Sequence, residues 1–150
     1  MTGTIIIKQA AIQDIPRIVP VFESYREYFN QKRDPIATDS FLFDRFEHRE
    51  SVMLIAEVDD DVVGIAHLYP SFSSLSLQRI WILNDFFIIE RFRSQGIGKQ
   101  LIAEVKEYAR LTKIKGIELS VEHTNTNAWA FWENRGFKLD EEFRYYFFKM

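Results

Sequence analysis

The chain of 150 residues contains no cysteine. Disulfide bonds, thiolate ligands for metals and a cysteine nucleophile are therefore excluded together. Its three histidines, His48, His67 and His123, are far apart in the sequence, and no HExxH motif is present. We therefore expect no metal site.

The sequence also lacks a long apolar run and a strong charge of one sign. No run approaches the roughly 18 residues of a membrane-spanning helix, and residues 1–10 lack the basic start of a signal peptide. We therefore expect a cytoplasmic protein without a membrane partner. Because 19 basic and 22 acidic residues give a net charge of −3, no general positive field attracts nucleic acid.

The composition is that of one globular domain. Hydrophobic residues make up 47% of the chain and charged residues 27%, which excludes general disorder. The length matches a single domain that spans residues 1–150. Phe supplies 14 of the aromatic residues, so the core is expected to be rich in aromatic rings.

The first half of the chain alternates strand and helix patterns. A β-branched run at Thr4–Lys8 predicts a strand, and Asp14 followed by helical apolar spacing predicts a helix with Pro16 in its first turn. Residues Asn30–Asp39 are expected to form a loop that Pro35 interrupts, before a shorter helix.

Three apolar segments in the middle of the chain predict strands. Val52–Val58 and Val62–Tyr69 flank three aspartates and indicate an antiparallel hairpin. The serine-rich stretch Pro70–Gln78 is expected to be a surface connection. It leads into Arg79–Ile89, whose nearly continuous apolar character indicates a strand buried on both faces.

The last third of the chain continues this mixed order. A helical pattern follows from Ile97 to about Gly116, and Ile117–Glu122 predicts a strand. Asn125–Arg135 predicts a short helix, and Phe137–Phe148 predicts one or two final strands. The whole is a mixed α/β domain of the α+β type, with a βαβ unit around Gly96.

The turn Arg93–Lys99 carries the first indication of chemistry. Gly96 and Gly98 let backbone amides approach a ligand, and the positive end of the following helix dipole points at the same place. The segment lacks the third glycine of a GxGxxG fingerprint and the GK[ST] ending of a P-loop. We expect an anion site, with Arg93 and Lys99 as added positive charges or as plain surface cations.

Two motifs in order resemble a known family. Asp85–Ile88 followed by RSQGIGKQL resembles the acetyl-CoA motif of the GNAT superfamily of N-acetyltransferases. Asn125–Ala128 and Phe131–Phe137 resemble the family segment N-x-x-A-x-x-x-Y-E-x-x-G-F, with Trp132 in place of the tyrosine. The strings LYPSFSS and LNDFFI are most similar to the diamine and polyamine acetyltransferases and the yeast-type histone acetyltransferases.

The resemblance implies a fold, a co-substrate and its contacts. The fold would be a mixed sheet of six or seven strands with four helices, and acetyl-CoA would be the acyl donor, with no metal. The implied coenzyme-binding residues are Phe87, Ile88, Arg93, Ser94, Gln95, Gly96, Ile97, Gly98, Lys99, Asn125 and Trp132. We place the reaction in the gap between the strands Arg79–Ile89 and Ile117–Glu122.

The catalytic groups depart from the family pattern. Where the diamine enzymes carry Glu-Asp, this chain has Asn84 and Asp85, so Asp85 is the remaining carboxylate. Strand alternation places Asp85 on the wrong face for this role unless a bulge or a relaying water intervenes. His123 is a second candidate base. Each also has another interpretation: Asp85 could bind the substrate ammonium or form a structural pair, and His123 could be a plain strand-end histidine.

The usual acid is absent too. The indole of Trp132 donates a hydrogen bond but cannot release its proton, and Tyr145 and Tyr146 are alternative hydroxyls. Without cysteine no acetyl-thiol intermediate is possible, which favours direct attack by the amine in a ternary complex.

The acceptor implied by the resemblance is a primary amine, which leaves polyamines, lysine side chains and other small amines open. A homodimer through the aromatic segment Phe143–Phe148 is expected. The alternative function is a coenzyme A-binding module of the same fold with little or no catalysis.

Overall fold

The computed structural model describes residues 3–150, which divide into two compact units: one through Leu119, and Ser120–Met150. The strands are β1 (Ile5–Gln9), β2 (Val52–Val58), β3 (Asp61–Ser73), β4 (Gln78–Ile88) and β5 (Ile117–Glu118). The helices are α1 (Ile15–Tyr28), α2 (Pro35–Glu47), α3 (Ile97–Leu111) and α4 (Thr126–Glu133), with 3₁₀ turns at Ile12–Asp14 and Glu90–Phe92. The second unit contains α4.

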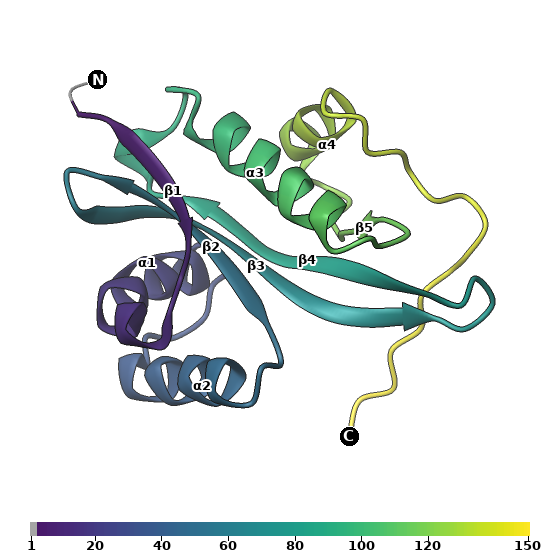
Figure 1. Cartoon of the computed structure of the whole chain (residues 1–150), viewed down its shortest axis with the longest axis horizontal. Helices are drawn as coiled ribbons and strands as arrows, with labels where there is room; N and C mark the ends of the chain where they lie inside the picture. Colours follow the sequence, from purple (N-terminus) through teal and green to yellow (C-terminus); the bar gives the residue numbers. More distant parts are fainter. Residues whose placement is uncertain (1–2) are drawn as a thin grey trace. The chain divides into compact units, whose positions relative to one another are not determined.

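The first unit is a sheet covered by helices on both faces (Figure 1). Its strands lie in the order β1-β2-β3-β4-β5, antiparallel except for the parallel pair β4 and β5. The parallel pair and the α3 crossover confirm the expected βαβ unit. Apolar side chains from α1, α2 and the sheet form the core of one face: Ile15, Ile18, Val21, Phe22, Leu42, Met53, Ile55, Val62, Ile65 and Phe87.

The mixed α/β class with four α-helices is confirmed, but the expected number of strands is wrong. The sheet has five strands among the described residues, not six or seven. The difference lies in Phe137–Phe148, which forms no strand although it is rich in aromatic residues. Aromatic residues favour strands only where a neighbouring strand supplies a hydrogen-bond ladder, and Phe143, Tyr145, Tyr146, Phe147 and Phe148 are exposed.

Two prolines mark boundaries that the sequence pattern misplaced. Pro35 does not interrupt a loop but begins α2, where its missing amide hydrogen is not needed, and the Asp34 carboxylate accepts from the Ala37 amide at 3.1 Å. The expected loop at Pro70–Gln78 is shorter, because β3 continues to Ser73. Pro70 pairs with Trp81 of β4 on one side, but β2 begins at Val52, opposite Leu68, and does not reach Pro70 on the other side. The missing backbone amide donor of Pro70 is therefore tolerated.

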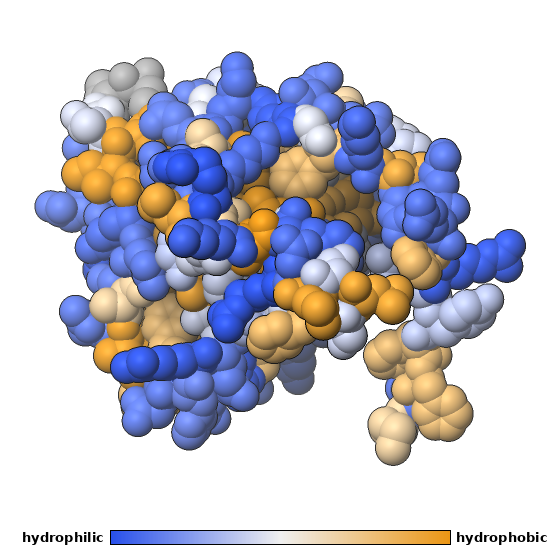
Figure 2. All heavy atoms as spheres, turned by 45° about the vertical axis from the view of Figure 1, so that its right-hand side comes forward, coloured by the Kyte–Doolittle hydropathy of each residue, from blue (hydrophilic) through white to orange (hydrophobic). Residues whose placement is uncertain are grey.

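The face drawn in Figure 2 is largely hydrophilic, with apolar side chains between the polar ones. Among the large apolar side chains of the first unit, Leu75 and Leu77 are the most exposed, and they lie in the turn that joins β3 to β4. Within residues 3–150, no helix is both long and apolar enough to cross a membrane.

A buried carboxylate joins α1 to the start of α2. Glu23 is fully buried, and it accepts hydrogen bonds from Thr38 Oγ1 at 2.8 Å, from Arg26 Nη1 at 3.0 Å and from the Asp34 amide. Burial acts to raise the pKa of Glu23, but the hydrogen bonds outweigh it and lower that pKa below its ordinary value. The ionised form therefore stabilises the junction of the two helices.

We predict that Glu23→Gln lowers the free energy of unfolding by about 1–3 kcal/mol, because a buried acceptor of three donors is impaired. Because the pKa of Glu23 is lower in the folded than in the unfolded state, its ionised form stabilises the fold fully above the unfolded pKa of about 4.3. This stabilisation is lost as the pH falls through the folded pKa. The variant should therefore lose less stability on acidification. Urea unfolding between about pH 3 and 7 measures both effects.

Glu27→Gln on the same helix is the matched control. Glu27 pairs with Arg33 at 2.6 Å, but both side chains are about half exposed. Its removal should change stability by less than about 1 kcal/mol. Equal effects of the two substitutions would contradict the role given to Glu23.

Candidate active site

A β-bulge in β4 decides which way Asp85 faces. The β3–β4 register pairs Asp85 with His67 and Leu83 with Leu68, which leaves Asn84 as an extra residue. Strict alternation from Trp81 would place Asp85 on the α3 face, where the Trp81 indole donates to Thr112 of α3 at 2.9 Å. The bulge instead turns Asp85 towards the opposite face.

On that face Asp85 belongs to a buried hydrogen-bonded chain. Asp85 Oδ2 lies 2.9 Å from Nδ1 of His67, and Nε2 of His67 lies 2.7 Å from Oγ of Ser51. The imidazole is fully buried between aromatic rings of Phe22 in α1 and Phe46 in α2. The amide of Asn84 donates to the other carboxylate oxygen, Oδ1, at 3.1 Å.

Two tyrosines next to this chain are held in their protonated forms. Burial and the neighbouring Asp85 charge raise the pKa of Tyr69 to about 12. The pKa of Tyr25 is raised further, by burial, by the Asp85 charge and by a hydrogen bond to Asp85. Both hydroxyls are therefore hydrogen-bond donors at neutral pH.

Beside the bulge, β4 loses its neighbour on one edge. The parallel pairing with β5 joins Trp81 to Ile117 and Ile82 to Glu118, and among residues 3–150 no strand pairs with this edge from Leu83 to Ile88. A parallel strand edge without a partner offers backbone groups to an extended ligand, as strand addition does. The strand expected at Ile117–Glu122 is shorter, because β5 ends at Glu118.

The predicted anion turn follows β4 directly. Gly96 adopts φ +84°, a left-handed conformation, as the N-cap residue of α3. The first amide bonded within α3 is that of Gln100, which donates to the Gly96 carbonyl at 3.1 Å. The amides of Ile97, Gly98 and Lys99 precede it and are the helix-terminal donors that bind anions.

The other residues of this turn have different roles. Ser94 also has a positive φ of 62°, and the Gln95 side chain donates to the Arg91 carbonyl at 3.1 Å. Ile97 is buried and anchors the first turn of α3, whereas Lys99 is exposed.

Arg93 holds the end of β4. Its Nε donates to the Ile88 carbonyl at 2.8 Å, and its guanidinium lies 5.0 Å from the ring of Phe87 and 5.6 Å from that of Tyr28. These contacts tie the turn to β4 and to α1. Phe87 itself packs in the core, so its side chain is structural and only its backbone is a candidate ligand contact.

The remaining predicted residues belong to the second unit. Asn125 is the N-cap of α4 and accepts from the Ala128 amide at 3.3 Å. Trp132 is half-buried between Phe131 and Phe137, at ring distances of 4.9 and 5.4 Å. His123 is exposed in the turn before α4. Within the first unit, the structure joins Arg93 to Phe87 and Ile88, and Asp85 lies two residues before Phe87 on the same strand.

Sequence reasoning missed the partners of Asp85. His67 was considered only as a metal ligand, and Ser51, Tyr25 and Tyr69 were not singled out. A signal was present for His67, because it is an imidazole inside the otherwise apolar run Val62–Leu68. Ser51 had no such signal, since only the strand pairing brings it to His67.

The sequence and the fold are similar to those of acetyltransferases. Residues 18–137 match the model of the acetyltransferase (GNAT) family. The chain is 40% identical to the uncharacterized N-acetyltransferase YhfO of Bacillus subtilis over 140 residues, which cover 93% of this chain and 94% of the relative. A crystal structure of a probable acetyltransferase has a TM-score of 0.92 and 36% identity, with 97% of each chain covered.

A relative with a stated substrate matches more locally. The spermine/spermidine N(1)-acetyltransferase of Bacillus subtilis is 34% identical over 88 residues, which cover 56% of this chain and 57% of the relative. The family match and these relatives identify the chain as an acyl-transferring enzyme. The chain belongs to the GNAT family and is an acetyltransferase, which confirms the resemblance of its two motifs.

We predict that Arg93→Lys lowers the free energy of unfolding by about 1 kcal/mol, because lysine keeps the charge but not the guanidinium that bonds Ile88 and covers Phe87. Thermal unfolding measures the change. The control is Arg91→Lys, an exposed residue whose guanidinium lies 5.0 Å from the ring of Phe92, and it should have little effect. Equal losses would contradict the anchoring role of Arg93.

Proposed function

We propose that this protein transfers the acetyl group of acetyl-CoA to a primary amine, by direct attack in a ternary complex. The observation that supports the proposal most is the continuity of β4 with the anion turn: one unpaired strand edge leads straight to the amides at the start of α3. An acyl donor with a diphosphate and an extended arm matches both features. We also propose that both units form one domain, because the family match at 18–137 crosses their boundary.

The residues present fit acetyl-CoA. Gly96 has no atom within 4 Å of the place where a Cβ would lie, so the backbone of the turn is open to a close ligand. The helix-terminal amides of Ile97 to Lys99 would hold the diphosphate, and Lys99 and Ser94 are exposed beside them. When bound, the coenzyme supplies an activated acyl group. We keep Asn125 and Trp132 of the second unit as further candidate contacts.

The acceptor amine must lose a proton before it attacks, and we propose Asp85 as the base. Its carboxylate lies on the bulge, where β5 no longer covers the edge of β4, and the Tyr25 and Tyr69 hydroxyls lie around it. His123 is the second candidate. The relative that acetylates spermine and spermidine supports a polyamine as the first acceptor to test.

Release of coenzyme A thiol from acetyl-CoA, measured with a panel of spermidine, a lysine peptide and an aminoglycoside, tests the activity. We predict release that depends on one of these amines. Gly96→Ala should weaken coenzyme binding and slow release at least about tenfold, because a left-handed Ala costs roughly 1–2 kcal/mol and moves the amides. Isothermal titration calorimetry with coenzyme A measures the binding.

Gly116→Ala is the matched control. Neither glycine has an atom near the Cβ position, but only Gly96 has a positive φ. Gly116→Ala should therefore leave binding unchanged. Coenzyme binding without any amine-dependent release would favour the non-catalytic module, and absence of binding in the folded wild type would overturn the proposal.

We predict that Asp85→Asn reduces kcat about 100-fold or more near neutral pH, the usual contribution of a general base. Because a primary ammonium has a pKa near 10, the free amine becomes abundant as the pH rises, and the deficit should shrink between about pH 7 and 10. A deficit of the same size across this range would assign Asp85 a purely structural role. His123→Gln, measured in parallel, tests the second candidate by the same criterion.

A further inference from the structure

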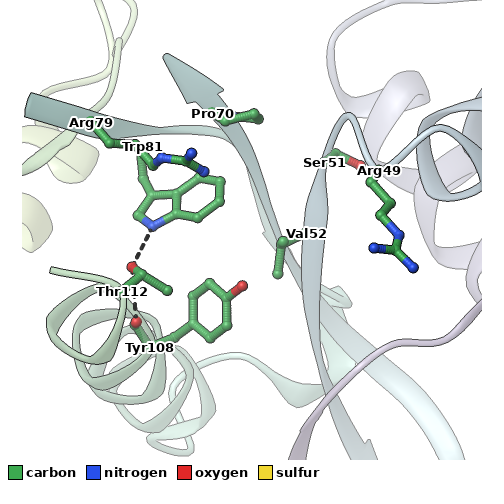
Figure 3. A pocket seen from close by; sticks show the side chains of 8 residues that line it. All are labelled: Arg49, Ser51, Val52, Pro70, Arg79, Trp81, Tyr108 and Thr112. Carbon is green, nitrogen blue, oxygen red and sulfur yellow. Dashed lines mark hydrogen bonds between the residues drawn. The ribbon is translucent and has the colours of Figure 1, made fainter. Parts of the chain in front are cut away.

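A pocket of about 420 Å³ lies on the α3 face of the sheet. The side chains that shape it are Val52, Pro70, Arg79, Trp81, Tyr108 and Thr112. Arg49 and Ser51 also border it, but Figure 3 shows the Arg49 guanidinium and the Ser51 oxygen turned away from it. The volume is in the range of pockets that hold small molecules.

The pocket is separate from the site proposed for acetyl transfer. Trp81 lies about 13 Å before Asp85 along β4, and the bulge turns Asp85 to the opposite face of the sheet. Tyr108 and Thr112 lie at the C-terminal end of α3, whereas the anion turn lies at its N-terminal end. A molecule bound here would therefore be a second ligand and not part of the acyl donor.

The walls of the pocket suit a flat apolar group. The ring of Trp81 lies 5.8 Å from that of Tyr108, and the two rings are tilted by 45°. Figure 3 shows the Tyr108 side chain pointing from α3 towards Val52, with Pro70 on β3. The indole N–H of Trp81 is already bonded to Thr112, so Trp81 offers its ring to a ligand and not a donor. An aromatic ring can pack against side chains of this kind.

Two lining groups are donors for an anion. Arg79 is exposed and has no ion-pair partner among the described residues. Burial raises the pKa of the Tyr108 phenol, although the positive charge of Arg79 acts to lower it, so the two groups lie near each other. The Tyr108 hydroxyl is therefore protonated at neutral pH, and within residues 3–150 it has no hydrogen-bond partner. No lining residue in this part of the chain is acidic.

We propose that this pocket binds a small aromatic carboxylate. The ring of the ligand packs against Trp81, Val52 and Pro70, and its carboxylate accepts from the Arg79 guanidinium and the Tyr108 hydroxyl. A guanidinium and a carboxylate have matching planar geometries, which permit two parallel hydrogen bonds. An aromatic amine is disfavoured, because its ammonium would meet the Arg79 charge with no lining carboxylate to offset it.

The test is a titration of ¹⁵N-labelled protein with phenylacetate, followed by NMR of the tryptophan indole N–H groups. The chain has three tryptophans, and Trp81→Phe assigns the signal of Trp81. This N–H is bonded to Thr112 beside the pocket, so its signal reports a ligand there. We expect phenylacetate to shift it with a dissociation constant of about 1 mM or lower. Phenylacetamide, the neutral analogue, should bind at least about tenfold more weakly.

Two substitutions test the donors separately. Arg79→Gln removes the charge of an exposed side chain, so it should weaken phenylacetate binding at least about tenfold and leave phenylacetamide binding nearly unchanged. Tyr108→Phe keeps the ring but removes the hydroxyl, and it should weaken phenylacetate binding about threefold or more. The matched control is Arg110→Gln on α3, because Arg110 is exposed and pairs with Glu107 at 2.6 Å. It should leave binding unchanged.

Three results would contradict the proposal: no shift of the Trp81 signal at about 10 mM phenylacetate, equal affinities for phenylacetate and phenylacetamide, or equal losses in Arg79→Gln and Arg110→Gln. Displacement of phenylacetate by coenzyme A would also contradict it, since the two sites would then be one. If the NMR spectrum shows that Arg79→Gln does not fold, Tyr108→Phe and the comparison of the two probes decide. The titration uses neither acetyl-CoA nor an acceptor amine, so its result is independent of the proposed transferase activity.

Discussion

The buried pair of Asp85 and His67 fixes the geometry on which the site depends. Two ionisable side chains in an apolar core are tolerated only when their polar atoms are bonded, and here Ser51 and Asn84 complete the set. The pair forms only if Asn84 bulges out of β4, because a regular strand would place Asp85 on the α3 face. The hydrogen bond between Asp85 and His67 therefore depends on three features at once: the β3–β4 register, the bulge at Asn84 and the direction of the Asp85 side chain.

Much of the fold follows from local signals in the sequence. The hairpin of β2 and β3, the helix after Asp14 and the βαβ unit were expected from apolar periodicity and turn residues, and the structure contains them. The failure at Phe137–Phe148 has a physical cause. Strand formation depends on a partner outside the segment, and periodicity within the segment carries no information about that partner.

The sequence predicted the anion turn but not the hydrogen-bonded chain from Asp85 to Ser51. The anion turn is local, since a glycine at positive φ and a helix N-terminus lie within a few residues of each other. The chain from Asp85 to Ser51 joins three strands or their ends, at positions 16 and 18 residues apart. Its existence depends on register, and the single extra residue Asn84 reverses which face the following side chains occupy.

The chemistry at position 84 is coupled to this pair. The amide of Asn84 donates to Asp85 Oδ1, so it satisfies the carboxylate oxygen that does not face His67. A glutamate at the same position, as in the diamine enzymes that the motif resembles, has no such donor and would bring a second negative charge to Asp85. Asn84 thus fits a site in which Asp85 is the only carboxylate of the pair. The amide at position 84 and the buried carboxylate at position 85 therefore depend on each other through one hydrogen bond.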